Sequence, residues 1–182
     1  MSRWHRRWLP FAVAVVAAVV AAASVNEHAF YNLRFHLGLY SRDARKAEIE
    51  QTLRQFNRDF ATFFNVGGPT SILPTFPADN LIKRRIFQEV RYWDGMNAVM
   101  VYDKDTFTIE KIELTRPDRA VVIAREVWYI SAQDAVTRKT ISTLKKSPER
   151  VRYILRLDHG KWRVMEFEIY GEKDAIPAEV KG

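Results

Sequence analysis

The 182-residue sequence contains no cysteine, which excludes disulfide bonds and thiolate chemistry. Histidine is scarce, and no histidine is paired with acidic residues at a spacing typical of a metal site. The four histidines are His5, His28, His36 and His159. A phosphate-binding glycine loop and a Gly-x-Ser-x-Gly nucleophile motif are also missing. We therefore expect no catalytic residue, no cofactor and no bound metal, and we predict that the protein is not an enzyme.

A strong excess of one charge is missing from most of the chain. The formal net charge is +7, but Arg3, Arg6 and Arg7 lie together near the amino terminus. Without them the excess falls to +4, which is typical of an ordinary surface rather than of a nucleic-acid-binding stripe. The one tight basic run, residues 83–85, is interpreted as the solvated face of a helix. We therefore expect no nucleic-acid partner.

Long hydrophobic runs are absent except for residues 9–25, which follow the arginines and carry no charge over about 17 residues. A helix of this length spans about 25 Å, the short end of what a bilayer core of about 30 Å requires. Basic residues before a span stay in the cytoplasm. We therefore predict that residues 1–25 form a signal anchor in a bacterial inner membrane. The protein is then single-pass, with its amino terminus cytoplasmic and its carboxyl-terminal domain in the periplasm.

The alternative to a retained span is a cleaved signal peptide, because residues 21–23 are three alanines, a run of small residues of the kind that signal peptidase cuts. In a retained span, tryptophans suit the membrane interface, and small residues four apart let helices approach closely. Such spacing also arises by chance in a span so rich in alanine. The candidate lipid or helix contacts are Trp4, Trp8, Ala14, Ala18 and Ala22.

Residues 26–42 form an aromatic juxtamembrane segment that contains Phe30, Tyr31, Phe35 and Tyr40. The spacing of its apolar residues fits a strand as well as a helix, so periodicity does not decide its structure. Aromatic side chains beside a span commonly lie in the membrane interface. We predict that these four side chains contact the membrane or a partner. The alternative is a linker that packs on its own domain.

The globular domain is expected over residues 43–171, and it begins with two helices. Residues 43–65 repeat apolar side chains at helical spacing, and glycines and a proline follow at 67–69. Residues 78–93 carry a second apolar stripe, which stops at Asp94 and Gly95. We interpret both stripes as core. They consist of Ile49, Leu53, Phe56, Phe60 and Phe63, and of Ile82, Ile86, Val90 and Trp93.

After the helices the pattern changes to strands, which are expected over residues 106–114, 120–131, 151–158 and 161–170. Turns are expected at 116–119 and at 159–160. Residues 133–148 are either a strand extension or a mobile loop, and 172–182 form a polar tail. This order predicts an α+β fold in which helices pack on an antiparallel sheet.

The last strand is expected to alternate, with Met165, Phe167 and Ile169 on one face and Glu166 and Glu168 on the other. The apolar face should pack against the helices. We therefore expect a shared core made of Phe56, Phe60, Ile86, Val90, Phe167 and Ile169.

The segment 152–164, RYILRLDHGKWRV, resembles the last hairpin of the nuclear-transport-factor-2-like superfamily. There a strand ending in aspartate-glycine often returns through tryptophan-arginine-valine; here His159 stands between the aspartate and the glycine. Residues 120–129 resemble the preceding strand. The resemblance implies a cone-like fold with a pocket between the helices and a curved sheet. It implies no single function, because the scaffold serves isomerases, dehydratases, ligand binders and assembly domains, including membrane-anchored secretion and chloroplast-division proteins.

Polar residues near the expected opening of the cone are the remaining candidates for chemistry. Tyr92, Asp94, Asp103 and Asp105 lie there, but no histidine accompanies them, and residues 103–105 are interpreted as an exposed turn. A second group lies on strands and is interpreted as a polar sheet face with cross-strand ion pairs. Its members are Arg125, Glu126, Arg152, Arg156, Glu166 and Glu168.

Two functions fit these observations. We expect a non-catalytic accessory or assembly subunit of a membrane protein complex, whose partners are other membrane subunits and the lipid bilayer. The alternative is a periplasmic small-ligand-binding protein or enzyme of the same cone fold, with the signal peptide cleaved. A filled cone with an exposed apolar patch favours the first function. A deep pocket that holds a group with a strongly shifted pKa favours the second.

Overall fold

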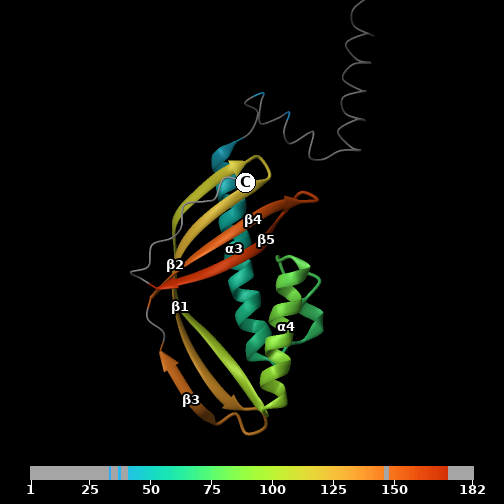
Figure 1. The fold of residues 1–182 in the computed structure, drawn as a ribbon, viewed down its shortest axis with the longest axis vertical. Coiled ribbons are helices and arrows are strands. Elements are labelled where there is room, and N and C mark those ends of the chain that lie inside the picture. Colours follow the sequence, from blue (N-terminus) through green and yellow to red (C-terminus); the bar gives the residue numbers. More distant parts are fainter. Residues whose placement is uncertain (1–32, 34–36, 38–40, 146–147, 172–182) are drawn as a thin grey trace, which may run out of the picture. The chain divides into compact units, whose positions relative to one another are not determined.

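The computed structural model describes Leu33, Leu37 and residues 41–145 and 148–171. From residue 41 onward, the described chain forms two α-helices, a short 3-10 helix and five strands. They are α3 (Arg42–Asn65), η1 (Thr70–Ile72), α4 (Asn80–Gly95), β1 (Ala98–Arg116), β2 (Arg119–Asp134), β3 (Thr140–Lys145), β4 (Glu149–Asp158) and β5 (Lys161–Gly171). The predicted α+β fold is confirmed. Both helices lie against one face of a curved antiparallel sheet, the cone-like arrangement that the sequence resemblance implied (Figure 1).

The carboxyl end of α3 is fixed by two glycines. Gly67 and Gly68 have φ angles of +77° and +79°, which an L side chain rarely adopts. The Gly68 amide donates to the carbonyl of Phe63 at 2.7 Å, which closes the last turn. A Cβ on Gly68 would lie 2.8 Å from Val90 Cγ1 on α4. The absence of a side chain here therefore lets the two helices approach closely.

The start of α4 is tied both to its own cap and to the sheet. The carboxylate of Asp79 accepts a hydrogen bond from the Leu81 amide at 2.7 Å, which satisfies one of the unpaired donors of the first turn. The residues just before the helix pair with β5: Val164 donates to the Pro77 carbonyl at 2.9 Å, and Asp79 donates to the Val164 carbonyl at 2.8 Å. These bonds tie the residues before α4 to the edge strand β5. The helix itself begins at Asn80, two residues after its predicted start.

The strands pair in the order β1-β2-β4-β5, and β3 pairs with the far end of β2. The prediction of an exposed turn at Asp103–Asp105 is wrong, because these residues lie inside β1, which begins at Ala98. Lys104 pairs with Trp128, and the register shifts between Lys104 and Thr106. A bulge absorbs the extra residue, so the charged run stays within the strand.

The predicted hairpin turns are confirmed. Asp158 pairs with Lys161, and His159 and Gly160 between them have φ angles of +46° and +72°, as a two-residue turn of the primed type requires. Residues 133–148 extend β2 to Asp134, and β3 follows after a short turn. The Asp134 carboxylate accepts from the Thr137 amide at 2.7 Å in that turn.

The expected alternation in β5 is confirmed for Phe167 and Ile169 against Glu166 and Glu168, and a bulge interrupts it at Met165. Ile154 of β4 pairs with Glu166, and the next residue, Leu155, pairs with Val164, so Met165 between them has no pairing partner. The shift puts Phe167 and Ile169 on the same face as buried Val164. Met165, which the prediction grouped with them, is the unpaired residue of the bulge.

The expected shared core holds in part. Phe56, Ile86 and Val90 are buried, and Phe60 and Phe167 are half-buried. The prediction that Ile169 is buried is wrong, because its side chain is 53% exposed. It lies on the inner face of the sheet but borders a cavity rather than solid core.

Candidate functional site: the cone cavity

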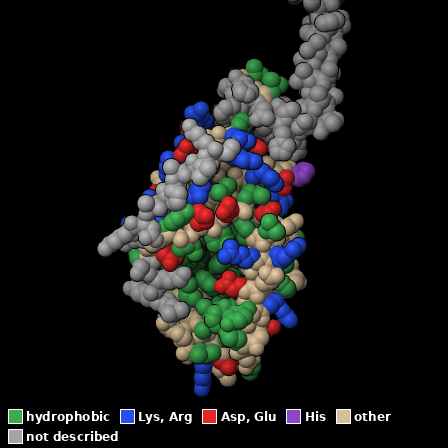
Figure 2. All heavy atoms as spheres, in the orientation of Figure 1, with side chains coloured by type: hydrophobic (Ala, Val, Ile, Leu, Met, Phe, Trp, Pro, Cys, Tyr) green, Lys and Arg blue, Asp and Glu red, His purple; other side chains and the backbone are tan. Residues whose placement is uncertain are grey.

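A cavity of about 250 Å³ lies between the two helices and the inner face of the sheet. Figure 2 shows a hollow on one face of the molecule, with hydrophobic side chains inside it and acidic and basic side chains around it. Aromatic side chains from α3 and from four strands make up much of the cavity wall. They are Phe56, Phe60, Tyr102, Trp128, Tyr153 and Phe167.

These rings pack mainly edge to face. The centroid of Phe56 lies 6.0 Å from that of Tyr153 and 5.8 Å from that of Phe167, in edge geometry in both cases. The centroid of Phe60 lies 5.2 Å from that of Tyr102 in the same geometry. Such pairs contribute roughly 0.5–1.5 kcal/mol each beyond the area they bury. The wall of the cavity is therefore held by its own rings.

Tyr102 is positioned by a clamp from the end of α3. The Asn65 side chain donates to the Tyr102 carbonyl at 3.1 Å and accepts from the Tyr102 amide at 2.7 Å. These two bonds join α3 to β1 beside the cavity. Burial raises the pKa of Tyr102 to about 12, so its phenol stays protonated at neutral pH.

Glu126 of β2 is a buried carboxyl group in the cavity lining, only 2% exposed. One of its oxygens accepts from the Tyr153 hydroxyl at 2.5 Å and from the Asn57 amide at 3.5 Å. The other accepts from the Trp128 indole at 2.7 Å. The three donors come from α3, β2 and β4, so the folded chain assembles this group from distant segments. A buried carboxyl group requires such partners.

Two ionisable groups beside Glu126 have shifted pKa values. Burial raises the pKa of Tyr153 well above its usual value, and the neighbouring carboxyl group adds to the shift. Burial also lowers the pKa of Lys104 to about 8, against the opposing attraction of Glu126. The Lys104 ammonium lies 3.9 Å from the Glu126 carboxyl group and 3.9 Å from the centroid of the Phe107 ring. Lys104 lines a neighbouring groove rather than the cavity itself.

The polar residues singled out near the cone opening do not line the cavity. Tyr92 is 62% exposed, and Asp94 pairs with Arg91 at 3.3 Å on the surface of α4. Asp103 borders the groove beside Lys104. Asp105 lies at the β1 bulge.

The interpretation of Glu126 as part of a polar sheet face is wrong. It lies in the inward-facing series of β2, alternating with exposed or half-buried neighbours. Buried residues of that series are Ala120, Val122, Ala124, Trp128 and Ile130. That parity was readable in the sequence and could have identified a carboxyl group facing the core. The expected cross-strand ion pair is confirmed for Arg152 and Glu168, at 3.0 Å.

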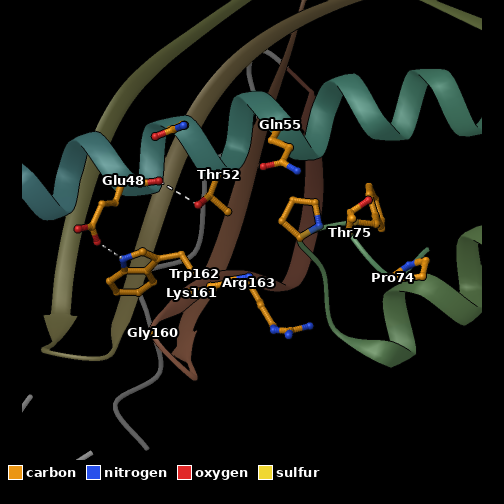
Figure 3. Close-up of a pocket in the computed structure, with 12 residues that line it drawn as sticks. Glu48, Thr52, Gln55, Pro74, Thr75, Gly160, Lys161, Trp162 and Arg163 are labelled. Atoms are coloured by element: carbon orange, nitrogen blue, oxygen red, sulfur yellow. Dashed lines mark hydrogen bonds between the residues drawn. The ribbon is translucent and has the colours of Figure 1, made fainter. Parts of the chain in front are cut away.

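A second hollow, of about 450 Å³, lies between the first half of α3, the loop before α4 and the β4–β5 hairpin (Figure 3). Its lining is polar and apolar in about equal parts, and Figure 3 shows Trp162 directed at Glu48 across it. The Trp162 indole donates to Glu48 at 3.3 Å, and Thr52 donates to the Glu48 carbonyl at 2.9 Å. The first of these bonds joins α3 to the hairpin and the second lies within α3, so we assign this hollow a structural role.

The part of the chain that the structure describes holds neither a candidate membrane span nor a candidate metal centre. No helix there is both long and apolar enough to cross a bilayer. No three acidic or histidine side chains there converge as a metal ion requires. The predicted span, the four juxtamembrane aromatic residues and the tail lie outside the described residues. The predicted contact residues among them are Trp4, Trp8, Ala14, Ala18, Ala22, Phe30, Tyr31, Phe35 and Tyr40.

No protein-family model matches the chain, and no curated protein matches it. Among solved structures, it is similar to the intermembrane-space region of the chloroplast protein ARC6, with a TM-score of 0.61 and 16% identity over 73% of this chain and 100% of that one. Aln2 from a Streptomyces species gives a TM-score of 0.42 and 17% identity over 73% and 93% of the two chains.

An NTF2-like protein of unknown function from Prochlorococcus marinus gives a TM-score of 0.38 and 17% identity over 74% and 97%. Neither this likeness nor that to Aln2 supports further argument, because both TM-scores are below 0.5. At 16% identity the likeness to the ARC6 region establishes a shared fold, two helices on a curved antiparallel sheet, and no more than the fold.

Proposed function

We propose that the chain is a non-catalytic accessory or assembly subunit of a membrane protein complex. Its cone domain is an interaction domain held in the periplasm by one transmembrane helix. The anchor is supported by Arg3, Arg6 and Arg7 before the uncharged run at residues 9–25. The observation that carries the non-catalytic part is the closed hydrogen-bond network around Glu126.

Both oxygens of Glu126 are engaged by donors of the protein itself, the Trp128 indole and the Tyr153 hydroxyl. A general base needs an oxygen directed at the proton it removes, within hydrogen-bond reach of a bound substrate. Tyr153 remains a donor at neutral pH, because burial raises its pKa well above the usual value. The network therefore favours a role in holding the cavity's shape and charge over a role in proton transfer.

Likeness to the ARC6 region supports the placement of the domain. That region lies in an intermembrane space of the chloroplast. A domain of this fold is thus known in such a compartment. We extend this placement to the present domain as part of the proposal.

The test is extraction of the full-length protein in mild detergent, followed by identification of the proteins that co-purify with it. Replacing Phe30, Tyr31, Phe35 and Tyr40 together by alanine should release the partners, because aromatic anchors contribute about 2 kcal/mol or more each at interface centres. A matched control replaces Leu81 and Tyr92, which are 71% and 62% exposed on α4. Retention of every partner by the fourfold variant would overturn the proposed interface.

The anchor has a separate test. Amino-terminal sequencing of the membrane-extracted protein should give the unprocessed terminus. A mature terminus at Ser24 or Val25 would show that the segment is a cleaved signal peptide and would overturn the single-span proposal.

A second candidate function, a periplasmic small-ligand-binding protein, is favoured by one specific observation. The cone is not filled, since a cavity of about 250 Å³ remains with the buried Glu126 carboxyl group in its lining. Polar groups that converge in an apolar pocket are a common basis for ligand binding. We propose that the cavity serves recognition under either candidate, in addition to the juxtamembrane aromatic contacts of the first, and that the candidates differ in whether its occupant is a free molecule or part of a partner.

A further inference from the structure

The cavity lining is acidic, although the chain as a whole is basic. Glu89, Glu126 and Glu149 contribute three carboxyl groups to the lining, and Arg85 contributes one guanidinium group. Glu126 is the buried one among them, Glu149 is half-buried and has contacts of its own, and Glu89 and Arg85 are exposed. The formal net charge of the chain is +7, so this local excess runs against the overall balance. Charges interact more strongly in an apolar, partly closed site than in water. The occupant that this lining favours is therefore a cation.

The hydrogen-bond donors around Glu126 hold its carboxyl group in place and contribute no positive charge of their own. Tyr153, Trp128 and Asn57 supply hydroxyl, indole and amide groups, none of which carries a positive charge. In the described part of the chain, Lys104 is the one cation that forms an ion pair with Glu126. At 3.9 Å the pair is longer than a hydrogen bond, and Lys104 approaches from the neighbouring groove.

The aromatic wall adds a second attraction for a cation. The faces of tyrosine, tryptophan and phenylalanine rings attract ammonium and guanidinium groups, and the attraction is stronger when the site excludes water. Trp128 already illustrates this, because the Lys104 ammonium lies 4.8 Å from the centroid of its ring. Tyr102 and Phe60 pack against the same tryptophan and extend this wall.

The cavity volume limits the size of the cation. Sites for drug-sized molecules measure about 300–1,000 Å³, and this cavity is smaller, at about 250 Å³. It suits a group about the size of one side chain. We propose that the cone cavity binds an alkylammonium group, carried by a free amine or by a lysine side chain of a partner. This inference rests on the binding role proposed above for the cavity.

The test uses the full-length protein in an uncharged detergent and follows the Trp128 indole signal by ¹⁵N NMR, assigned with the Trp128→Phe variant. Two probes of similar size are titrated at neutral pH, n-butylammonium and the uncharged 1-butanol. We expect butylammonium to shift the signal and to bind at least about tenfold more tightly than butanol. That ratio corresponds to about 1.4 kcal/mol. Equal binding of the two probes would overturn the inference.

The Glu126→Gln variant tests the source of the attraction. It should weaken butylammonium binding about tenfold or more, whereas the matched control Glu166→Gln, on the outer face of β5, should leave it unchanged. Unchanged affinity in Glu126→Gln would contradict the inference. If that variant does not fold, the comparison of the two probes on the wild-type protein decides by itself.

A further arm identifies what carries the ammonium group. It compares a pentapeptide that has lysine between glycines with the same peptide carrying glutamine. Binding of the lysine peptide supports a partner's side chain, and binding of butylammonium alone supports a free amine. Failure of the inference is distinct from failure of the assembly role. Partners that co-purify without any ammonium binding contradict only the cation site, and ammonium binding without any partner contradicts only the assembly role.

Discussion

The two halves of α3 solve different packing problems. Its first half buries the aliphatic side chains Ile49 and Leu53 completely, where the sheet contributes the fully buried Leu155 and Val164. Its second half presents phenylalanines, and there a cavity remains around Glu126. Branched aliphatic side chains interlock to crystal-like density, whereas flat rings meet edge to face at larger spacings. One helix therefore closes one end of the cone and keeps the other end open.

The largest expected effect is at the closed end. Leu53→Ala should lower the free energy of unfolding by about 3 kcal/mol, because the side chain is fully buried and its removal leaves a void. Urea unfolding of the full-length protein in detergent measures this loss. The control Leu81→Ala, on the exposed face of α4, should cost less than about 0.5 kcal/mol. A loss at Leu53 no greater than the control's would erase the distinction between the two ends.

At the open end, hydrogen bonds should contribute more to the free energy of unfolding than packing does. Tyr153→Phe keeps the ring but removes the donor at 2.5 Å from Glu126. We expect a loss of about 2 kcal/mol in unfolding free energy, since the carboxyl group loses its shortest buried hydrogen bond. The same measurement on Tyr92→Phe, at a 62% exposed position, should show almost no change. An unaltered stability in Tyr153→Phe would mean that the network does not hold the open end together.

The open end should also respond to pH through Lys104, which Glu126, Arg54 and two aromatic rings surround. Its pKa is lowered to about 8 in the folded protein, from 10.5. Between these values the unfolded chain binds more protons than the folded one, so stability should rise with pH. After allowance for solvent screening we expect a gain of about 1 kcal/mol.

This gain is measured by urea unfolding at several values between about pH 7.5 and pH 9.5, below the range where Tyr102 titrates. Lys104→Met should flatten the slope. Lys111→Met, which removes an exposed lysine from the same strand, should retain it. Equal slopes in the wild-type and Lys104→Met proteins would argue against a buried ammonium beside the cavity.

The smallest effect is expected at the mouth of the cavity. Ile169→Ala should cost less than about 1 kcal/mol, because the side chain is already 53% exposed. A fully buried isoleucine would cost about 2–5 kcal/mol on the same scale. A loss in that higher range would show that something covers the mouth in solution, and it would remove the contrast with Leu53.

Local patterns were sufficient to predict the two helices and the two hairpin turns, but not the strand that runs through Asp103–Asp105. The apolar stripe of α3 and its glycine end, and the His159-Gly160 turn, depend on residues close together in the chain. The cavity depends on distant residues. Asn57 and Tyr153 are 96 positions apart, and both contact Glu126. The phenylalanines of α3 were therefore interpreted as uniform core, although some of them form a cavity wall.

The bulge at Met165 in β5 was missed for a different reason. Strict alternation assigns a face to every residue from its number alone, and one unpaired residue reverses the assignment for the rest of the strand. Glu126 shows the opposite case, because β2 keeps its alternation from Ala120 to Ile130 and the inward position of Glu126 was available from parity. The charge of Glu126 indicates an exposed position, whereas its place in the alternation of β2 predicts the buried position that the structure shows.

The bulge at Met165 gives the edge strand one spare residue. If its codon were deleted, Glu166 would follow Val164 in regular pairing, and Phe167 would still face the helices. The central strand β2 has no such reserve, because it pairs with β4 from Arg119 to Glu126 without a shift. Loss of one residue there would turn part of the cavity lining outward. Over evolutionary time, this domain should therefore tolerate a single-residue deletion in β5 far better than in β2.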